Sequence, residues 1–145
     1  MCNVENTMNV YLKFGIVILA ILLLDVTWIG INAKMYSDSV KLVQKSEMVL
    51  RYHYVVMAYV MVAFATLYVT IPFAMSKIDM KEDDIATKLY KSFAYGGGAG
   101  FCIYGIYNLT CLSIYQDYDA RVAITDTIWG TFLNTIIVLI YTLLS

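Results

Sequence analysis

Four long apolar stretches, separated by shorter polar ones, dominate the sequence. They cover roughly residues 10–32, 48–72, 89–114 and 121–144. Each is about as long as the ~20 residues that a helix needs to cross the hydrocarbon core of a bilayer. The pattern predicts an all-α integral membrane protein, an antiparallel bundle of four transmembrane helices that forms a single domain over residues 1–145. Four crossings would place both termini on the same side.

The polar connections between these stretches hold most of the charged residues. Residues 33–47 and 76–88 are expected to form loops, and a short loop over 115–120 makes the last two helices antiparallel neighbours. Pro72 is the only proline and is expected to lie at the end of the second helix, because proline interrupts helical hydrogen bonding. The polar residues before Val10 are expected to form a loose tail.

Composition supports the membrane assignment. The chain is 61% hydrophobic and 14% charged, whereas soluble domains average roughly 45–50% and about 25%. The net charge of −1 provides no basic face, so no nucleic-acid partner is expected and the lipid bilayer is the expected environment. Lys and Arg divide five and five between the two expected sides, so the positive-inside rule selects neither an orientation nor a particular membrane.

Two aspartates interrupt the first and last apolar stretches in the same sequence context. Asp25 is followed by Trp28, and Asp126 is followed by Trp129 at the same spacing. An ionised Asp near the centre of a membrane helix costs about 2.5–3.5 kcal/mol, so the presence of two of them indicates that they have a structural or functional role. Counted from the helix ends at about 1.5 Å per residue, both lie roughly 7–10 Å from the same side of the membrane. They are therefore expected in one leaflet.

The second and third stretches bring further polar residues to that leaflet, so the sequence predicts a polar cleft there. Such a cleft would bind a lipid headgroup or a small polar or cationic ligand, since charged residues in spans nearly always face the bundle interior or a water-filled cavity. The candidate cleft residues are Asp25, Trp28, Arg51, His53, Tyr104, Tyr107, Asn108, Asp126 and Trp129.

Other interpretations stay open. The aspartates could simply hydrogen-bond indole and threonine groups and hold the helices together, because polar side chains also serve as contacts between membrane helices. The protein could be a structural or assembly component of a cellular or viral membrane, as a homo-oligomer or with a membrane-protein partner. It could also be a lipid-modifying intramembrane enzyme in which one aspartate is a general base. No catalytic, cofactor or metal motif supports that activity, so no cofactor and no metal are expected.

Glycines are expected to allow close helix packing. Gly96 and Gly100 form a GxxxG pair in the third stretch, and Gly30 and Gly130 follow the two tryptophans. The helix that packs on the GxxxG pair is left open between the first helix, the second helix and a second copy of the chain.

Several of these elements together resemble a known family. They are Leu24-Asp25-x-x-Trp28-x-Gly30, Tyr36, Pro72, the glycine-rich start of the third helix, Tyr104-Gly105-Ile106-Tyr107-Asn108-Leu109-Thr110 and Asp126-x-x-Trp129-Gly130-Thr131. The chain resembles, over nearly its whole length, the domain-of-unknown-function family DUF2177, small four-helix predicted membrane proteins of bacteria, protists and large DNA viruses.

The resemblance implies the fold and the site but no established activity. Bacterial members are often associated with lipid-modification genes, which favours a link to lipids. The family usually reads Tyr-Asp-Leu-Thr-Asn in the third helix, whereas this chain has Asn108 in place of the Asp and Cys111 in place of the Asn. A third intramembrane carboxylate is therefore missing here.

Overall fold

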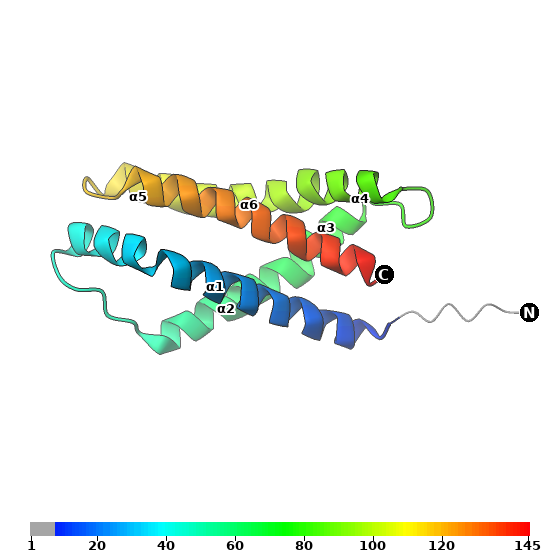
Figure 1. Ribbon diagram of the computed structural model, residues 1–145, viewed down its shortest axis with the longest axis horizontal. Coiled ribbons are helices and arrows are strands. Elements are labelled where there is room, and N and C mark those ends of the chain that lie inside the picture. Colours follow the sequence, from blue (N-terminus) through cyan, green and yellow to red (C-terminus); the bar gives the residue numbers. More distant parts are fainter. Residues whose placement is uncertain (1–7) are drawn as a thin grey trace, which may run out of the picture.

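The computed structural model describes residues 8–145, and these residues are mainly helical, without a strand among them. The prediction of an all-α protein is confirmed. Most of the expected polar tail before Val10 lies outside the described residues. Figure 1 shows α5 and α6 side by side along most of their length, α1 against α6, and the segment that starts with α2 crossing obliquely.

Helix α1 (Val10–Gln44) is longer than the first apolar stretch. Asn9 caps its start, where its side-chain oxygen accepts the Tyr11 backbone N–H at 2.9 Å. The helix continues past residue 32 and ends where Lys45 adopts a left-handed backbone with φ 57°. The expectation of a loop over 33–47 is therefore wrong for most of this segment. It contains no glycine or proline to stop the helix, and an exposed Lys34–Asp38 ion pair at i, i+4 supports it.

The second helical path is continuous but changes its winding. It consists of α2 (Tyr52–Ala65), the π-helical turn η1 (Thr66–Thr70) and α3 (Ile71–Met75). Pro72 is the second residue of α3, two positions after the π turn ends at Thr70. Proline lacks an N–H group and therefore removes one hydrogen-bond donor from the helical path. The path ends at Met75, within one turn of Pro72.

The remaining helices run from residue 85 to residue 143. Helix α4 (Ile85–Lys91) continues through the π-helical η2 (Ser92–Gly97) into α5 (Gly98–Ile114), and α6 (Ala120–Leu143) follows a short loop. Aspartates cap both starts. Asp84 accepts the Thr87 backbone N–H, and Asp119 accepts the Arg121 backbone N–H, each at 2.8 Å.

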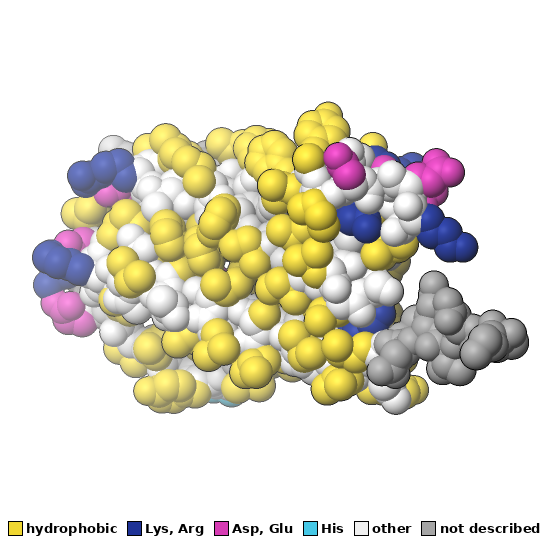
Figure 2. All heavy atoms as spheres, turned by 45° about the vertical axis from the view of Figure 1, so that its right-hand side comes forward, with side chains coloured by type: hydrophobic (Ala, Val, Ile, Leu, Met, Phe, Trp, Pro, Cys, Tyr) yellow, Lys and Arg dark blue, Asp and Glu magenta, His cyan; other side chains and the backbone are white. Residues whose placement is uncertain are grey.

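Within residues 8–145, three helical stretches are long and apolar enough to cross a membrane. They are Val10–Ile31, Tyr52–Met75 and Ala120–Leu143. The third apolar stretch, residues 89–114, is divided by η2, so neither α4 nor α5 alone reaches that length. Figure 2 shows hydrophobic side chains over the flank of the molecule and charged side chains gathered at its two ends. This distribution fits a protein that is surrounded by lipid.

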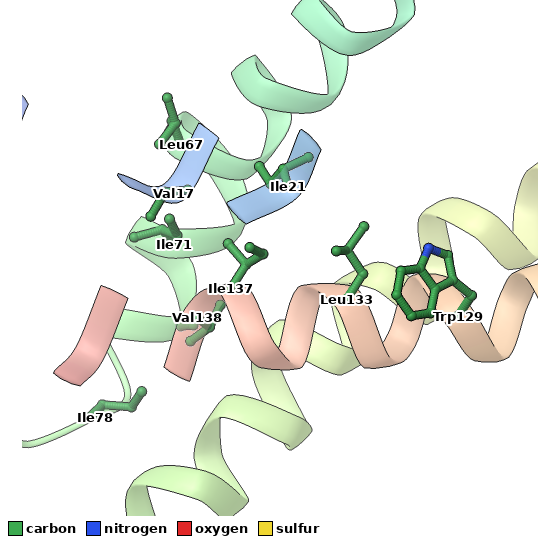
Figure 3. Packing of buried hydrophobic residues seen from close by; sticks show 10 residues of the cluster. Val17, Ile21, Leu67, Ile71, Ile78, Trp129, Leu133, Ile137 and Val138 are labelled. Atoms are coloured by element: carbon green, nitrogen blue, oxygen red, sulfur yellow. The ribbon is translucent and has the colours of Figure 1, made fainter. Parts of the chain in front are cut away.

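The apolar core occupies one half of the molecule. It is centred on α6, from which Leu133, Ile137 and Val138 meet Val17 of α1 and Ile71 of α3 (Figure 3). All five side chains are at most 2% exposed. Trp129 stands at the edge of this cluster in Figure 3, where the aliphatic contacts give way to polar ones.

The glycine-rich turn brings α5 close to α6. A methyl group added to Gly96 would meet Val138, and one added to Gly100 would meet the backbone carbonyl of Gly130. The GxxxG pair therefore packs on α6 of the same chain, and not on the first or second helix. Gly130 is covered in turn by the ring of Tyr104, whereas Gly30 has nothing within 4 Å of an added methyl group.

Candidate ligand-binding site between two Asp-Trp elements

Asp25 lies on α1 inside the candidate membrane span and accepts hydrogen bonds from two other helices. The Trp129 indole of α6 donates to Asp25 Oδ1 at 2.8 Å. The Tyr59 hydroxyl of α2 donates to Asp25 Oδ2 at 2.8 Å. Asp25 therefore connects α1, α2 and α6 through neutral donors.

Asp126 lies on α6 and is held in the same way. The Tyr36 hydroxyl of α1 donates to Asp126 Oδ1 at 2.9 Å, and the Asn108 amide of α5 donates to Asp126 Oδ2 at 2.8 Å. Tyr36 in turn accepts the indole N–H of Trp28 at 3.1 Å. Because an indole can only donate, this contact directs the Tyr36 proton toward the carboxylate.

The two tryptophans stack on each other between the aspartates. The ring centroids of Trp28 and Trp129 are 4.5 Å apart and the ring planes differ by 1°. Parallel aromatic pairs of this kind contribute about 0.5–1.5 kcal/mol beyond their buried area. The stack holds the two Asp-x-x-Trp elements together, although they are at opposite ends of the sequence.

A pocket of about 190 Å³ lies between these groups, and both aspartates line it. Its other walls come from Trp28, Ile29, Tyr36 and Tyr104. Within residues 8–145, the Tyr104 hydroxyl makes no hydrogen bond, so this group of the pocket wall is available to a ligand. The pocket has room for several water molecules or one small polar group.

Asn108 explains how the chain tolerates its departure from the family pattern. It is 1% exposed. Its amide N–H₂ group donates to Asp126 and to the Tyr104 backbone carbonyl, while its Oδ1 accepts the Tyr118 hydroxyl at 2.8 Å. Every polar atom of this buried side chain therefore has a partner. An aspartate here would face Asp126 without an N–H to donate.

No basic residue in the described part of the chain pairs with either aspartate of the site. No salt bridge in residues 8–145 reaches Asp25 or Asp126, and all four of their hydrogen-bond donors are neutral. Tyr36, beyond the end of the candidate span, is half buried. Burial, and then the adjacent Asp126 charge, raise the pKa of its hydroxyl well above the usual range. Tyr36 therefore remains a neutral donor.

The structure does not bring all predicted site residues together. Arg51 and His53 are exposed at the start of α2, where the His53 ring packs on Tyr54. Neither bonds to an aspartate among the described residues. Tyr107 is 63% exposed and does not line the pocket. The six remaining candidates, Asp25, Trp28, Tyr104, Asn108, Asp126 and Trp129, all contribute to the network or the pocket.

Three tyrosines of the network were missing from the predicted site: Tyr36, Tyr59 and Tyr118. Tyr36 has a recognisable signal, because it lies eleven positions after Asp25 and so on the same helical face once α1 is extended to Gln44. Tyr59 and Tyr118 have no such signal, since their positions depend on how α2 and the loop before α6 pack.

Residues 8–145 contain no group of three or more His, Cys, Asp and Glu side chains that could hold a metal ion. Cys102 and Cys111 are free thiols on α5, the first exposed and the second buried.

A comparison with protein-family models gives one match. The model described as "Predicted membrane protein (DUF2177)" matches residues 10–143. No curated protein and no solved structure matches the chain. The family match and the apolar helices identify an integral, multipass membrane protein that resides in a lipid bilayer. The resemblance expected from the sequence is confirmed, and the chain belongs to the DUF2177 family of predicted membrane proteins.

Proposed function

We propose that this protein binds an amine-bearing cation between Asp25 and Asp126, either the headgroup of a lipid or a small soluble amine. The observation that carries the proposal is the pairing of two carboxylates in one pocket without a basic partner in the described residues. Buried charges are normally paired, because an unpaired one loses its hydration without compensation. A cationic ligand provides that pairing.

The walls of the pocket favour the same chemistry. Trp28 and Tyr104 line it beside the aspartates, and aromatic rings attract cations through their negative faces. An ammonium group also carries N–H donors, for which the carboxylates are suitable acceptors. The volume of about 190 Å³ suits a compact ammonium group rather than a whole lipid.

We further propose that the chain is one domain that crosses the membrane four times as an antiparallel bundle, with both termini on the same side. The helical backbone from Ile85 to Ile114 supports this, because it is unbroken although its winding changes. Both aspartates then lie in one leaflet. In a background without the native cysteines, Lys81→Cys and Gln116→Cys should react with a membrane-impermeant thiol reagent from opposite sides. Reaction from the same side would contradict four crossings.

Lipid selectivity tests the binding proposal. The protein is purified from membranes that contain both phosphatidylethanolamine and phosphatidylglycerol, and the lipids that remain bound are identified by mass spectrometry. We expect the wild type to enrich the amine lipid, and Asp25→Asn with Asp126→Asn to return the ratio to that of the membrane. An unchanged wild-type ratio, together with absent binding of ethylammonium, would contradict the proposal. Binding of ethylammonium alone would indicate a soluble ligand.

The alternative of a purely structural role has its own supporting contact. The Trp129–Asp25 hydrogen bond joins α6 to α1, as expected if the carboxylate only holds helices together. In that case the Asn variants would lower stability, and neither variant would change the lipid ratio at equal yield of folded protein.

A further inference from the structure

A second pocket lies next to the carboxylate pocket, between the last turns of α1 and the end of α5. Its volume is about 210 Å³, and it shares no lining residue with the first. Ser39 lies one helical turn after Tyr36, and Tyr107 lies one turn after Tyr104. The same two helices thus contribute successive turns to the two pockets. The polar lining consists of Ser39, Gln44, Tyr107, Cys111, Tyr115 and Tyr118.

Ser39 is the unusual member of this lining. It is 3% exposed, and its hydroxyl has no hydrogen-bond partner within residues 8–145. A buried polar group without a partner loses its hydration without compensation and is rare in folded proteins. Serine and threonine hydroxyls in helices often bond to the carbonyl four positions earlier, as Thr27 does to Leu23. Ser39 makes no such bond, so its hydroxyl is available in the pocket.

The chemistry of the lining is neutral. Hydroxyl, amide and thiol groups surround the space, and no charged side chain lines it. Lys45 and Asp117 are adjacent in sequence to lining residues. They form an ion pair with each other, with Lys45 Nζ at 2.6 Å from Asp117 Oδ2. Burial raises the pKa of the Tyr118 hydroxyl above its usual range, so this group also remains neutral. A ligand here would therefore be recognised by hydrogen bonds and not by charge.

We propose that this second pocket binds a neutral hydroxyl- or ester-bearing group, with the Ser39 hydroxyl as one of its hydrogen-bond partners. The group would come from the glycerol portion of a lipid or from a soluble polyol. The pocket is larger than a single water requires, and its exposed rim of Tyr107 and Tyr115 leaves an entrance. This site is distinct from the amine site, because the two pockets have no lining residue in common, although Tyr118 of the second pocket is hydrogen-bonded through Asn108 to Asp126 of the first.

The thiol of Cys111 lines the pocket and reports its occupancy. In the full chain, Cys2→Ser and Cys102→Ser leave Cys111 as the single thiol. The protein is held in dodecylphosphocholine micelles, since this detergent has neither a hydroxyl nor a carboxylic ester. The alkylation rate of Cys111 by N-ethylmaleimide is then measured with added dioctanoylglycerol or with glycerol in the buffer.

We expect saturable protection, about threefold when the free ligand is near twice its Kd. Ser39→Ala should lose this protection. Ser113→Ala should keep it, because the exposed Ser113 hydroxyl bonds to the Thr110 carbonyl and does not line the pocket. Protection by dioctanoylglycerol alone assigns the group to a lipid, and protection by glycerol assigns it to a polyol. Absent protection by both, or equal protection in Ser39→Ala, would overturn the proposal.

Discussion

Trp129 donates its indole N–H to Asp25 at 2.8 Å, although the two residues are 104 positions apart in the chain. The tryptophan of the second Asp-x-x-Trp element thus donates a hydrogen bond to the aspartate of the first. The reverse connection runs through one intermediate, because Trp28 donates to Tyr36 and Tyr36 donates to Asp126. The two elements therefore form a single unit, which combines a stacked pair of indoles with a pair of carboxylates.

Trp129→Phe should separate the hydrogen bond from the stacking. Phenylalanine retains an aromatic ring beside Trp28 but leaves Asp25 Oδ1 without its donor. We expect the free energy of unfolding in detergent to fall by about 1–3 kcal/mol, the range for an unpaired buried polar group. Tyr90→Phe is the control, because Tyr90 is 68% exposed. Equal stability of the two variants would show that the hydrogen bond contributes nothing.

Gly100→Ala should destabilise the contact between α5 and α6. The added methyl group would meet the Gly130 backbone carbonyl, which cannot move without displacing α6. Overpacking of this kind costs typically 1–3 kcal/mol, about the size expected here. Gly98→Ala has nothing within 4 Å of the methyl group and should be neutral or stabilising by up to ~1 kcal/mol. Thermal unfolding of both variants checks this, and similar melting temperatures would contradict the packing.

Asn108→Asp should place a third carboxyl group against Asp126. The Asn108 amide now donates to Asp126 at 2.8 Å, and the substitution replaces that attraction with repulsion. We expect a loss of about 1–3 kcal/mol in unfolding free energy, partly recovered by added ethylammonium. Asn134→Asp is the control, because Asn134 is also buried but, among residues 8–145, its side chain donates to the Gly130 carbonyl and to no carboxylate. Recovery of both variants, or of neither, would argue against a cation site at Asp126.

Acidification should loosen the first turn of α4. The Thr87 side-chain and backbone hydrogen bonds lower the pKa of Asp84 below its ordinary value of 3.8. A carboxyl group whose pKa is lower in the folded state than in the unfolded state stabilises the fold at pH values above its unfolded-state pKa. This stabilisation is lost as the pH falls through the folded-state pKa. Amide hydrogen exchange in Ile85–Lys91 should therefore lose protection below about pH 4, after correction for the intrinsic exchange rate.

Asp84→Asn supplies the comparison for that experiment. Asparagine is an equally good helix cap but does not titrate. Its protection should be independent of pH over the same range. A parallel loss of protection in the wild type and the variant would show that Asp84 is not the responsible group.

The sequence predicted the helical fold and six residues of the network or the pocket, because carboxylates and tryptophans within apolar stretches are costly or bulky enough to be informative on their own. It did not predict where α1 ends, since residues 33–44 combine a polar composition with good helix formers. Tyr36 was missed for that reason. The partner of Gly100 was also unpredictable, because a GxxxG pair specifies close approach but not which helix approaches. Arg51 and His53 appeared close to the aspartates in depth, yet α2 leaves them exposed.

Tryptophan fluorescence during an amine titration tests the proposed cation site most directly, since Trp28 lines the pocket and Trp129, the other tryptophan of the chain, is stacked on Trp28. The protein in a neutral detergent is titrated with ethylammonium chloride, and with sodium chloride as the reference. We predict a saturable change in fluorescence with the amine and none with sodium chloride. Asp25→Asn and Asp126→Asn should each bind the amine roughly tenfold or more weakly at unchanged helical content. This loss is the size expected for a hydrogen bond to a charged group, about 1.5–3 kcal/mol. An identical response to both salts, or unchanged affinity in the two variants, would contradict the cation site.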